Sequence, residues 1–135
     1  NKSPYFDEPV DAMIYMVAAA LGFATIENLG AISGVNTAQG AFISGIFQIA
    51  SLRFVGATLL HSLVSATIGY FWAMDIRDFK ITKYVYIGIL WAVVLHTLFN
   101  YFIIRYGDLT YLLIYLSIVG FFILADFEKL RRRAI

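Results

Sequence analysis

The chain has 135 residues, of which 61% are hydrophobic and 14% are charged, with a formal net charge of +1 and a mean hydropathy of +0.78. Soluble domains carry about 25% charged and about 45–50% apolar residues, so this composition indicates an integral membrane protein. The near-neutral charge gives no case for nucleic-acid binding, and the lack of cysteine excludes disulfides, thiolate metal ligands and thiol nucleophiles.

Four apolar stretches are each close to the roughly 20 helical residues that a bilayer core requires. They run over about 10–30, 54–74, 82–106 and 109–125. Pro9 at a first-turn position, with Asp7 and Glu8 beside it, marks the start of the first helix. We therefore expect an all-α polytopic transmembrane helix bundle, a single membrane domain over 1–135 that ends in a basic cytoplasmic tail at 127–135.

The segment between the first two spans follows a different pattern. After the polar stretch GVNTAQG, its apolar part has only about 11 residues, too short to cross a bilayer. We expect a short interfacial or re-entrant helix at about 40–52. If this segment crossed the membrane, the orientation of every later span would invert.

The distribution of Lys and Arg predicts the orientation of the four spans. With the C-terminal tail in the cytoplasm, eight of the ten Lys and Arg residues lie inside and only Arg53 and Arg105 lie outside. This bias is the positive-inside pattern of membrane proteins. We therefore expect a multi-pass protein of the cell membrane, with both ends of this chain cytoplasmic.

Polar side chains interrupt three of the spans: Glu27 and Asn28 in the first, His61 in the second, and His96 with Asn100 in the third. A charged side chain at bilayer depth costs about 2.5–3.5 kcal/mol on insertion scales, so such residues usually face the bundle interior and serve a function. At about 1.5 Å per residue, they all lie within roughly 5–15 Å of the outer boundary. Their common depth predicts one shared site in the outer half of the membrane.

Spacing places these residues on polar stripes, because residues four apart share a helix face. Three such pairs occur, and they are Phe23 with Glu27, His61 with Ser65, and His96 with Asn100. Together the polar members could supply a general base, an orienting imidazole and an amide donor to an oxyanion. Small-residue pairs at Ala18–Gly22 and Gly30–Gly34 permit close helix packing.

The same side chains have other interpretations. Each is compatible with a structural role as an interfacial glutamate, a packed histidine or an interhelical hydrogen-bond pair. Glu27, His61 and His96 could bind a divalent metal such as zinc, with His61 and His96 as the natural ligands, although no HExxH motif is present. A haem between the histidines or a proton relay are further options. The alternative to an enzyme is therefore a non-catalytic scaffold or a small transporter, although no inverted repeat supports transport.

Three segments resemble the PrsW family of intramembrane proteases, which is related to the CAAX prenyl endopeptidases and the bacteriocin-processing membrane peptidases. They are FDEPVDAMIYMVAAALGFATIENLG, RFVGATLLHSLVSATIGYFWA and GILWAVVLHTLFNYF, and together they extend over residues 6–102. The FxxxE motif matches Phe23 and Glu27, with Asn28 beside it, the histidine of the next motif matches His61, and HxxxN matches His96 and Asn100.

The resemblance implies a membrane protease. Glutamate and histidine would activate water, and the last His and Asn would support an oxyanion. The implied substrate is a membrane-anchored protein or peptide in the lipid bilayer, cleaved near the outer leaflet, as in site-1-type cleavage of a regulator such as an anti-sigma factor. No cofactor is assured.

One family motif, a pair of adjacent glutamates in the pattern EExxK, is absent from this sequence. Asp7 and Glu8 do not replace it, because Pro9 follows them and they lie at the cytoplasmic end of the first span. We therefore expect the chain to be the C-terminal part of a larger protein, with the principal catalytic carboxylate on an earlier helix. The isolated chain is then expected to be inactive.

Overall fold

The computed structural model describes residues 6–33, 54–78, 83–106 and 109–132, and all of the regular structure in these ranges is helical. Helix α1 spans Pro9–Ser33, a π-helical turn spans Phe54–Thr58, and α3 follows directly as Leu59–Asp78. Helices α4 and α5 span Lys83–Tyr106 and Leu109–Arg131. The interfacial helix expected at 40–52 lies outside the described residues.

The all-helical prediction is confirmed, and three of the helices are long and apolar enough to cross a membrane. They are α1 over Pro9–Ala31, α4 over Lys83–Tyr106, and α5 over Thr110–Arg131. The crossing expected for 54–74 stays a prediction, because α3 is not among these three within the described residues. Its 20 residues include the polar side chains of His61, Ser65, Thr67 and Asp75, which lower its hydropathy.

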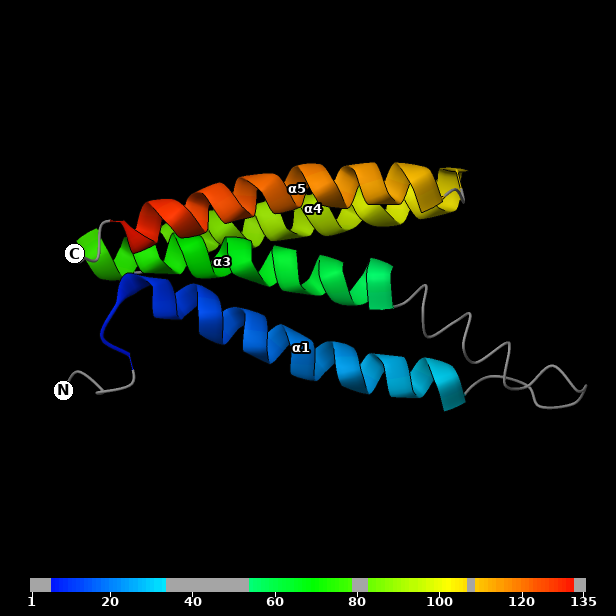
Figure 1. Cartoon of the computed structure of the whole chain (residues 1–135), viewed down its shortest axis with the longest axis horizontal. Helices are drawn as coiled ribbons and strands as arrows, with labels where there is room; N and C mark the ends of the chain where they lie inside the picture. The colour runs from blue at the N-terminus through cyan, green and yellow to red at the C-terminus, as the bar shows by residue number, and fades with distance from the viewer. Residues whose placement is uncertain (1–5, 34–53, 79–82, 107–108, 133–135) are drawn as a thin grey trace, which may run out of the picture.

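The helices lie side by side along the long axis of the molecule, with the start of α1 and the end of α5 at the same end (Figure 1). Helix α3 is central: it packs against α1 on one side, α4 on another and α5 on a third. Within the described helices, the backbones of α1 and α4 are not packed directly against each other. A side chain on α3 can therefore meet groups from both α1 and α4.

Two glycines allow the close packing of α3. A Cβ atom at Gly69 would lie 2.6 Å from the Cα of Met13 and 2.8 Å from the carbonyl oxygen of Ala12, so α1 approaches α3 backbone to backbone. At Gly88 of α4, a Cβ would lie 2.9 Å from the Cβ of Phe71. Small residues at such crossings are how membrane helices gain van der Waals contact.

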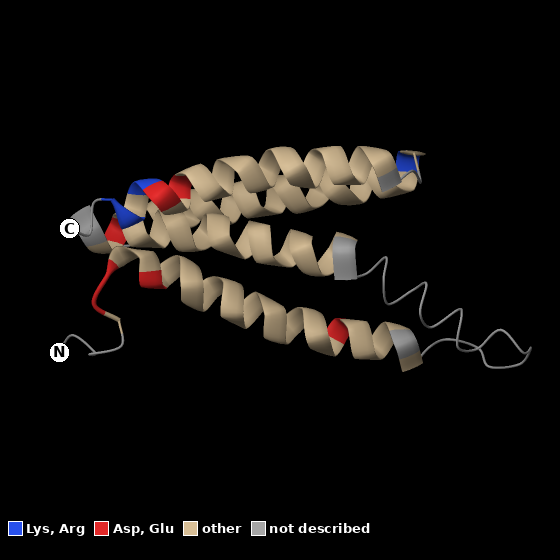
Figure 2. Ribbon diagram, viewed as in Figure 1, with Lys and Arg blue, Asp and Glu red and all other residues tan. Residues whose placement is uncertain are grey.

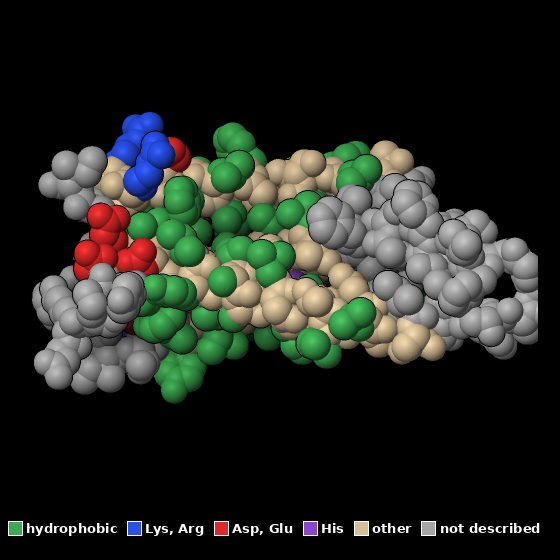
Figure 3. Space-filling view, turned by 60° about the horizontal axis from the view of Figure 1, so that its bottom comes forward, with side chains coloured by type: hydrophobic (Ala, Val, Ile, Leu, Met, Phe, Trp, Pro, Cys, Tyr) green, Lys and Arg blue, Asp and Glu red, His purple; other side chains and the backbone are tan. Residues whose placement is uncertain are grey.

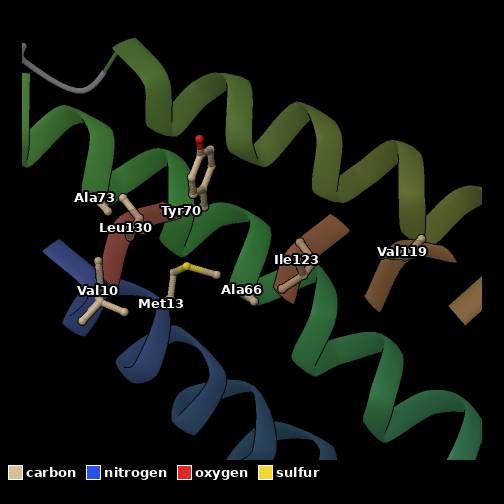
Figure 4. Packing of buried hydrophobic residues seen from close by; sticks show 9 residues of the cluster. Val10, Met13, Ala66, Tyr70, Ala73, Val119, Ile123 and Leu130 are labelled. Carbon is tan, nitrogen blue, oxygen red and sulfur yellow. The ribbon is translucent and has the colours of Figure 1, made fainter. Parts of the chain in front are cut away.

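The interior consists of two apolar clusters. The first joins α1, α3 and α5 and includes the buried side chains of Val10, Met13, Ala66, Tyr70 and Ile123 (Figure 4). The second joins α3, α4 and α5 nearer the opposite end, and its buried members are Leu60, Val64, Ala92, Phe99, Leu112 and Leu116. These clusters fix the three neighbours of α3 and thereby the register between helices.

Much of the outer surface is apolar, and Ile104 is 85% exposed and Phe121 70% exposed. Along the described helices the charged positions gather near the two ends of the bundle, apart from one acidic position well inside α1, which is Glu27 (Figure 2). Outward apolar side chains with charges at the ends are what a bilayer requires. The chain is an integral membrane protein.

Candidate functional site

Three helices bring Glu27, His61 and His96 together. The Oε2 atom of Glu27 on α1 lies 2.8 Å from Nε2 of His61 on α3. The ring of His96 on α4 lies against the same imidazole, with ring centroids 5.3 Å apart and planes at 57°. His61 is therefore the centre of the cluster, as its position on the central helix requires.

Burial differs between the members of the Glu27–His61 pair. The His61 side chain is 16% exposed, whereas the Glu27 side chain is 39% exposed. In the space-filling view a small part of a histidine is visible at the bottom of a recess in the apolar surface (Figure 3). An imidazole set below the surface next to an accessible carboxylate can be reached by a small reactant such as water.

A second hydrogen bond joins α1 to the π-helical turn that leads into α3. Asn28 Nδ2 donates to Oγ1 of Thr58 at 2.9 Å, and the carbonyl oxygen of Thr58 accepts a bond from Ser62 Oγ at 2.9 Å. Thr58 ends the π-helical turn that leads into α3. Single π-helical turns are frequent at functional sites, and this one precedes His61 by three residues.

Phe23 lies one turn before Glu27 on α1, and its ring meets the His61 ring edge to face, with centroids 5.3 Å apart at 74°. Phe23 is 57% exposed, so it forms the outward side of the imidazole's surroundings. The two residues of the FxxxE motif, Phe23 and Glu27, therefore both contact His61.

Helix α5 supports the α4 side of the site. The hydroxyl of Tyr115 donates to the carbonyl oxygen of Leu95 at 2.7 Å, one residue before His96. Phe99 is buried on the next turn of α4, and a Cβ on Gly56 would lie 3.5 Å from its ring. These contacts hold the turn of α4 that carries His96 against the start of α3.

The remaining predicted residues lie around this cluster without joining it. Ser65 is half-buried one turn beyond His61, and Asn100 is exposed one turn beyond His96. The Glu27–His61 bond is made without Asn100, which lies one turn further along α4 than His96. Sequence reasoning did not single out Thr58 or Tyr115, although each places a hydroxyl inside an apolar stretch.

The possible zinc site is incomplete. Catalytic zinc sites have three protein ligands. Across residues 6–33, 54–78, 83–106 and 109–132, no group of three or more His, Asp or Glu side chains is arranged to hold a metal ion. The Nε2 atom of His61 is engaged by Glu27, and His96 meets His61 ring against ring. As placed here, these residues do not fit a complete metal centre.

Comparison with known proteins gives consistent results. A family model described as "PrsW family intramembrane metalloprotease" matches residues 2–125. Protease PrsW of Clostridioides difficile (strain 630) is 29% identical over 103 residues, which are 74% of this chain and 41% of that protein. The chain thus spans less than half the length of this curated relative. No solved structure matches.

Proposed function

The chain belongs to the PrsW family of intramembrane metalloproteases, and from that premise we propose that its protein is an intramembrane endopeptidase. The substrate is a membrane-anchored protein, and the reaction is hydrolysis of one of its peptide bonds. The observation that carries the proposal is the 2.8 Å Glu27–His61 pair with the His96 ring against it, assembled from three helices of a membrane bundle. Ionisable residues at membrane depth are functional by default.

In this proposal His61 removes a proton from the attacking water. With Nε2–H donating to Glu27, the Nδ1 atom carries the lone pair that accepts this proton. The Glu27 carboxylate fixes this tautomer and stabilises the imidazolium that forms, as a buried carboxylate does beside other catalytic imidazoles. Phe23 limits the movement of the ring from one side.

His96 and Asn100 are proposed to stabilise the tetrahedral intermediate. They share one face of α4, and His96 already lies at the His61 ring. An N–H donor placed where the oxyanion develops contributes the largest single term in many hydrolases. Asn100 is exposed on this face, so a bound peptide could meet both donors.

We propose further that α3 is a fourth span and that the site lies in the outer half of the membrane, with both ends of this chain cytoplasmic. The antiparallel packing of α3 between α1 and α4 supports a crossing, because both neighbours are long enough to span the membrane. The eight-to-two distribution of Lys and Arg supports the orientation. The family resemblance then suggests cleavage of a regulator, such as an anti-sigma factor, near the outer leaflet.

The description of the family as metalloproteases leaves open a role for a metal ion that the described residues do not complete. If zinc is used, His61 and His96 are its natural ligands in this chain. None of the steps above depends on it. Elemental analysis of the intact protein and of a His61→Ala variant would decide whether His61 holds a metal.

A comparison of newly formed protein termini tests the proposed function. Cells that express the intact protein are compared with cells that express Glu27→Gln, and membrane-protein termini are labelled and identified by mass spectrometry. We expect cleavage products near single membrane spans with the wild type and a loss of about 100-fold or more with Glu27→Gln, because catalytic acid–base groups contribute about 10²–10⁴-fold. Glu128→Gln, at a 41% exposed carboxylate near the end of α5, is the matched control.

A different set of results would indicate that the protein is a non-catalytic scaffold. In that case Glu27→Gln and His96→Ala would lower the melting temperature in detergent and leave the pattern of termini unchanged. An enzyme would show the reverse: near-normal folding and expression with cleavage lost. Because the Glu27 side chain is 39% exposed, its substitution is expected to perturb packing little.

A further inference from the structure

An apolar pocket of about 260 Å³ lies between α1, α3 and α5, away from the Glu27–His61 pair. Its lining contains no polar side chain and consists of Met13, Ile14, Val17, Ala66, Ile123, Leu124 and Phe127. Met13, Ala66 and Ile123 approach one another from the three helices (Figure 4). A water molecule needs two to four polar partners, so a pocket of this lining holds hydrocarbon rather than water.

The pocket lies close to the end of the bundle where α1 starts and α5 ends. Met13 and Val17 follow Pro9 by four and eight residues, which is about 6 Å and about 12 Å along the helix axis. Phe127 precedes Arg131 by four residues, again about 6 Å. These depths are those of the first part of a lipid acyl chain below its headgroup.

Opposite charges flank the pocket on its two walls. On α5, Arg131 shares a helix face with Leu124 and Phe127, at spacings of seven and four residues. On α1, Asp11 precedes Ile14 by three residues and so lies on the same side of that helix. In the surface view, basic side chains and acidic side chains gather near each other at one end of the molecule, next to an apolar area (Figure 3).

Arg131 and Asp11 each have a partner within their own helix region, and each can still bind a ligand. Arg131 pairs with Glu128 at 2.7 Å, but the two side chains are 62% and 41% exposed, and exposed pairs of this kind contribute little. One carboxylate oxygen of Asp11 accepts the backbone N–H groups of Asp7 and Glu8. This cap holds the carboxylate at the start of α1, three residues before Ile14 of the pocket lining.

We propose that the pocket binds a zwitterionic phospholipid. One acyl chain occupies the apolar space, the phosphate meets Arg131 and the ammonium group meets Asp11. A lipid whose headgroup carries only the phosphate charge could pair with Arg131, but its negative charge would lie near the Asp11 carboxylate. The charge complementarity therefore favours an ethanolamine headgroup over a glycerol headgroup, and the site is independent of the proposed protease activity.

Native mass spectrometry of the intact protein in mild detergent tests the headgroup. The probes are phosphatidylethanolamine and phosphatidylglycerol with identical acyl chains. We expect about fivefold greater retention of phosphatidylethanolamine, the effect of one exposed ion pair. Asp11→Asn, whose side-chain oxygen can still accept the backbone N–H groups of Asp7 and Glu8, should remove this preference. Arg131→Gln should lower retention of both lipids, and Arg105→Gln, at the other end of the bundle, should change neither.

A second pair of variants tests the pocket itself. Leu124 is 67% exposed at the rim, so Leu124→Trp fills the pocket without entering the core, and it should lower retention of both lipids at least about fivefold. Ile104→Trp, at an 85% exposed position on α4, is the matched control. Equal retention of both lipids by the wild type would overturn the proposal. A Leu124→Trp variant that melts at a lower temperature but retains both lipids normally would also overturn the proposal. That result would show that another helix covers the pocket.

Discussion

Thr58 takes part in two hydrogen bonds beside the site. Its hydroxyl accepts a bond from Asn28 on α1, and its carbonyl oxygen accepts a bond from Ser62 on α3. We predict that Thr58→Val destabilises the protein by about 0.6–2 kcal/mol, because interhelical hydrogen bonds in membranes contribute this much. The melting temperature in detergent should fall, and cleavage should fall with it because Glu27 neighbours Asn28. Thr58→Ser keeps the hydroxyl and should retain both. Equal melting temperatures for Val and Ser would contradict a role for this bond.

At the scale of single residues, sequence reasoning found the three ionisable groups of the site because polar side chains are costly at membrane depth. It could not predict that Glu27 pairs with His61 rather than with His96. That choice depends on the rotation of α1 and α4 about the central α3, which the spacing within one helix does not contain. The Asn28–Thr58 bond was missed for the same reason. The exposed position of Asn100 leaves its predicted role untested.

At the scale of helices, close packing at Gly69 sets the distance between α1 and α3. We predict that Gly69→Ala lowers the melting temperature and the cleavage rate, because the new Cβ would lie 2.6 Å from the Cα of Met13 and push α1 away from His61. Gly22→Ala is the control: a Cβ there meets nothing within 4 Å, and alanine favours helix by about 1 kcal/mol. A Gly69→Ala protein as stable and active as Gly22→Ala would contradict this account.

Helix positions were predicted within a few residues from apolar length, and the main difference is that α5 continues to Arg131. Its last turns are amphipathic: Leu130 is buried while Arg131 is exposed, so hydropathy alone ended the helix too early. The close contacts of the described helices occur at other glycines than those of the small-residue pairs. Gly22 and Gly30 have no neighbour within 4 Å among the described residues, whereas Gly69 and Gly88 make the close contacts. A small residue shows where approach is possible, and only the partner helix decides where it occurs.

At the scale of the whole molecule, the central position of α3 explains both the site and the membrane prediction. His61 and Ser65 lower its hydropathy, yet α1, α4 and α5 cover three of its sides. A helix shielded by its neighbours can cross a bilayer with more polar residues than one that faces lipid. Composition therefore predicted a membrane protein correctly, while the crossing of the membrane by α3 stays a prediction.

The 135-residue sequence contains no cysteine, so single cysteines introduced into it can test the proposed four-span topology. Single cysteines at the exposed positions Glu8, Lys83 and Arg105 would be labelled in intact cells with a membrane-impermeant maleimide. We expect Arg105→Cys to react from outside and the other two only after the cells are opened, since α1 and α3 cross in opposite directions and α4 returns. Reaction of Lys83→Cys from outside while Glu8→Cys stays protected would show that α3 does not return the chain to the cytoplasm. The Glu27–His61 pair would then not lie in the outer half of the membrane as proposed. The proposed cleavage near the outer leaflet would lose its structural basis.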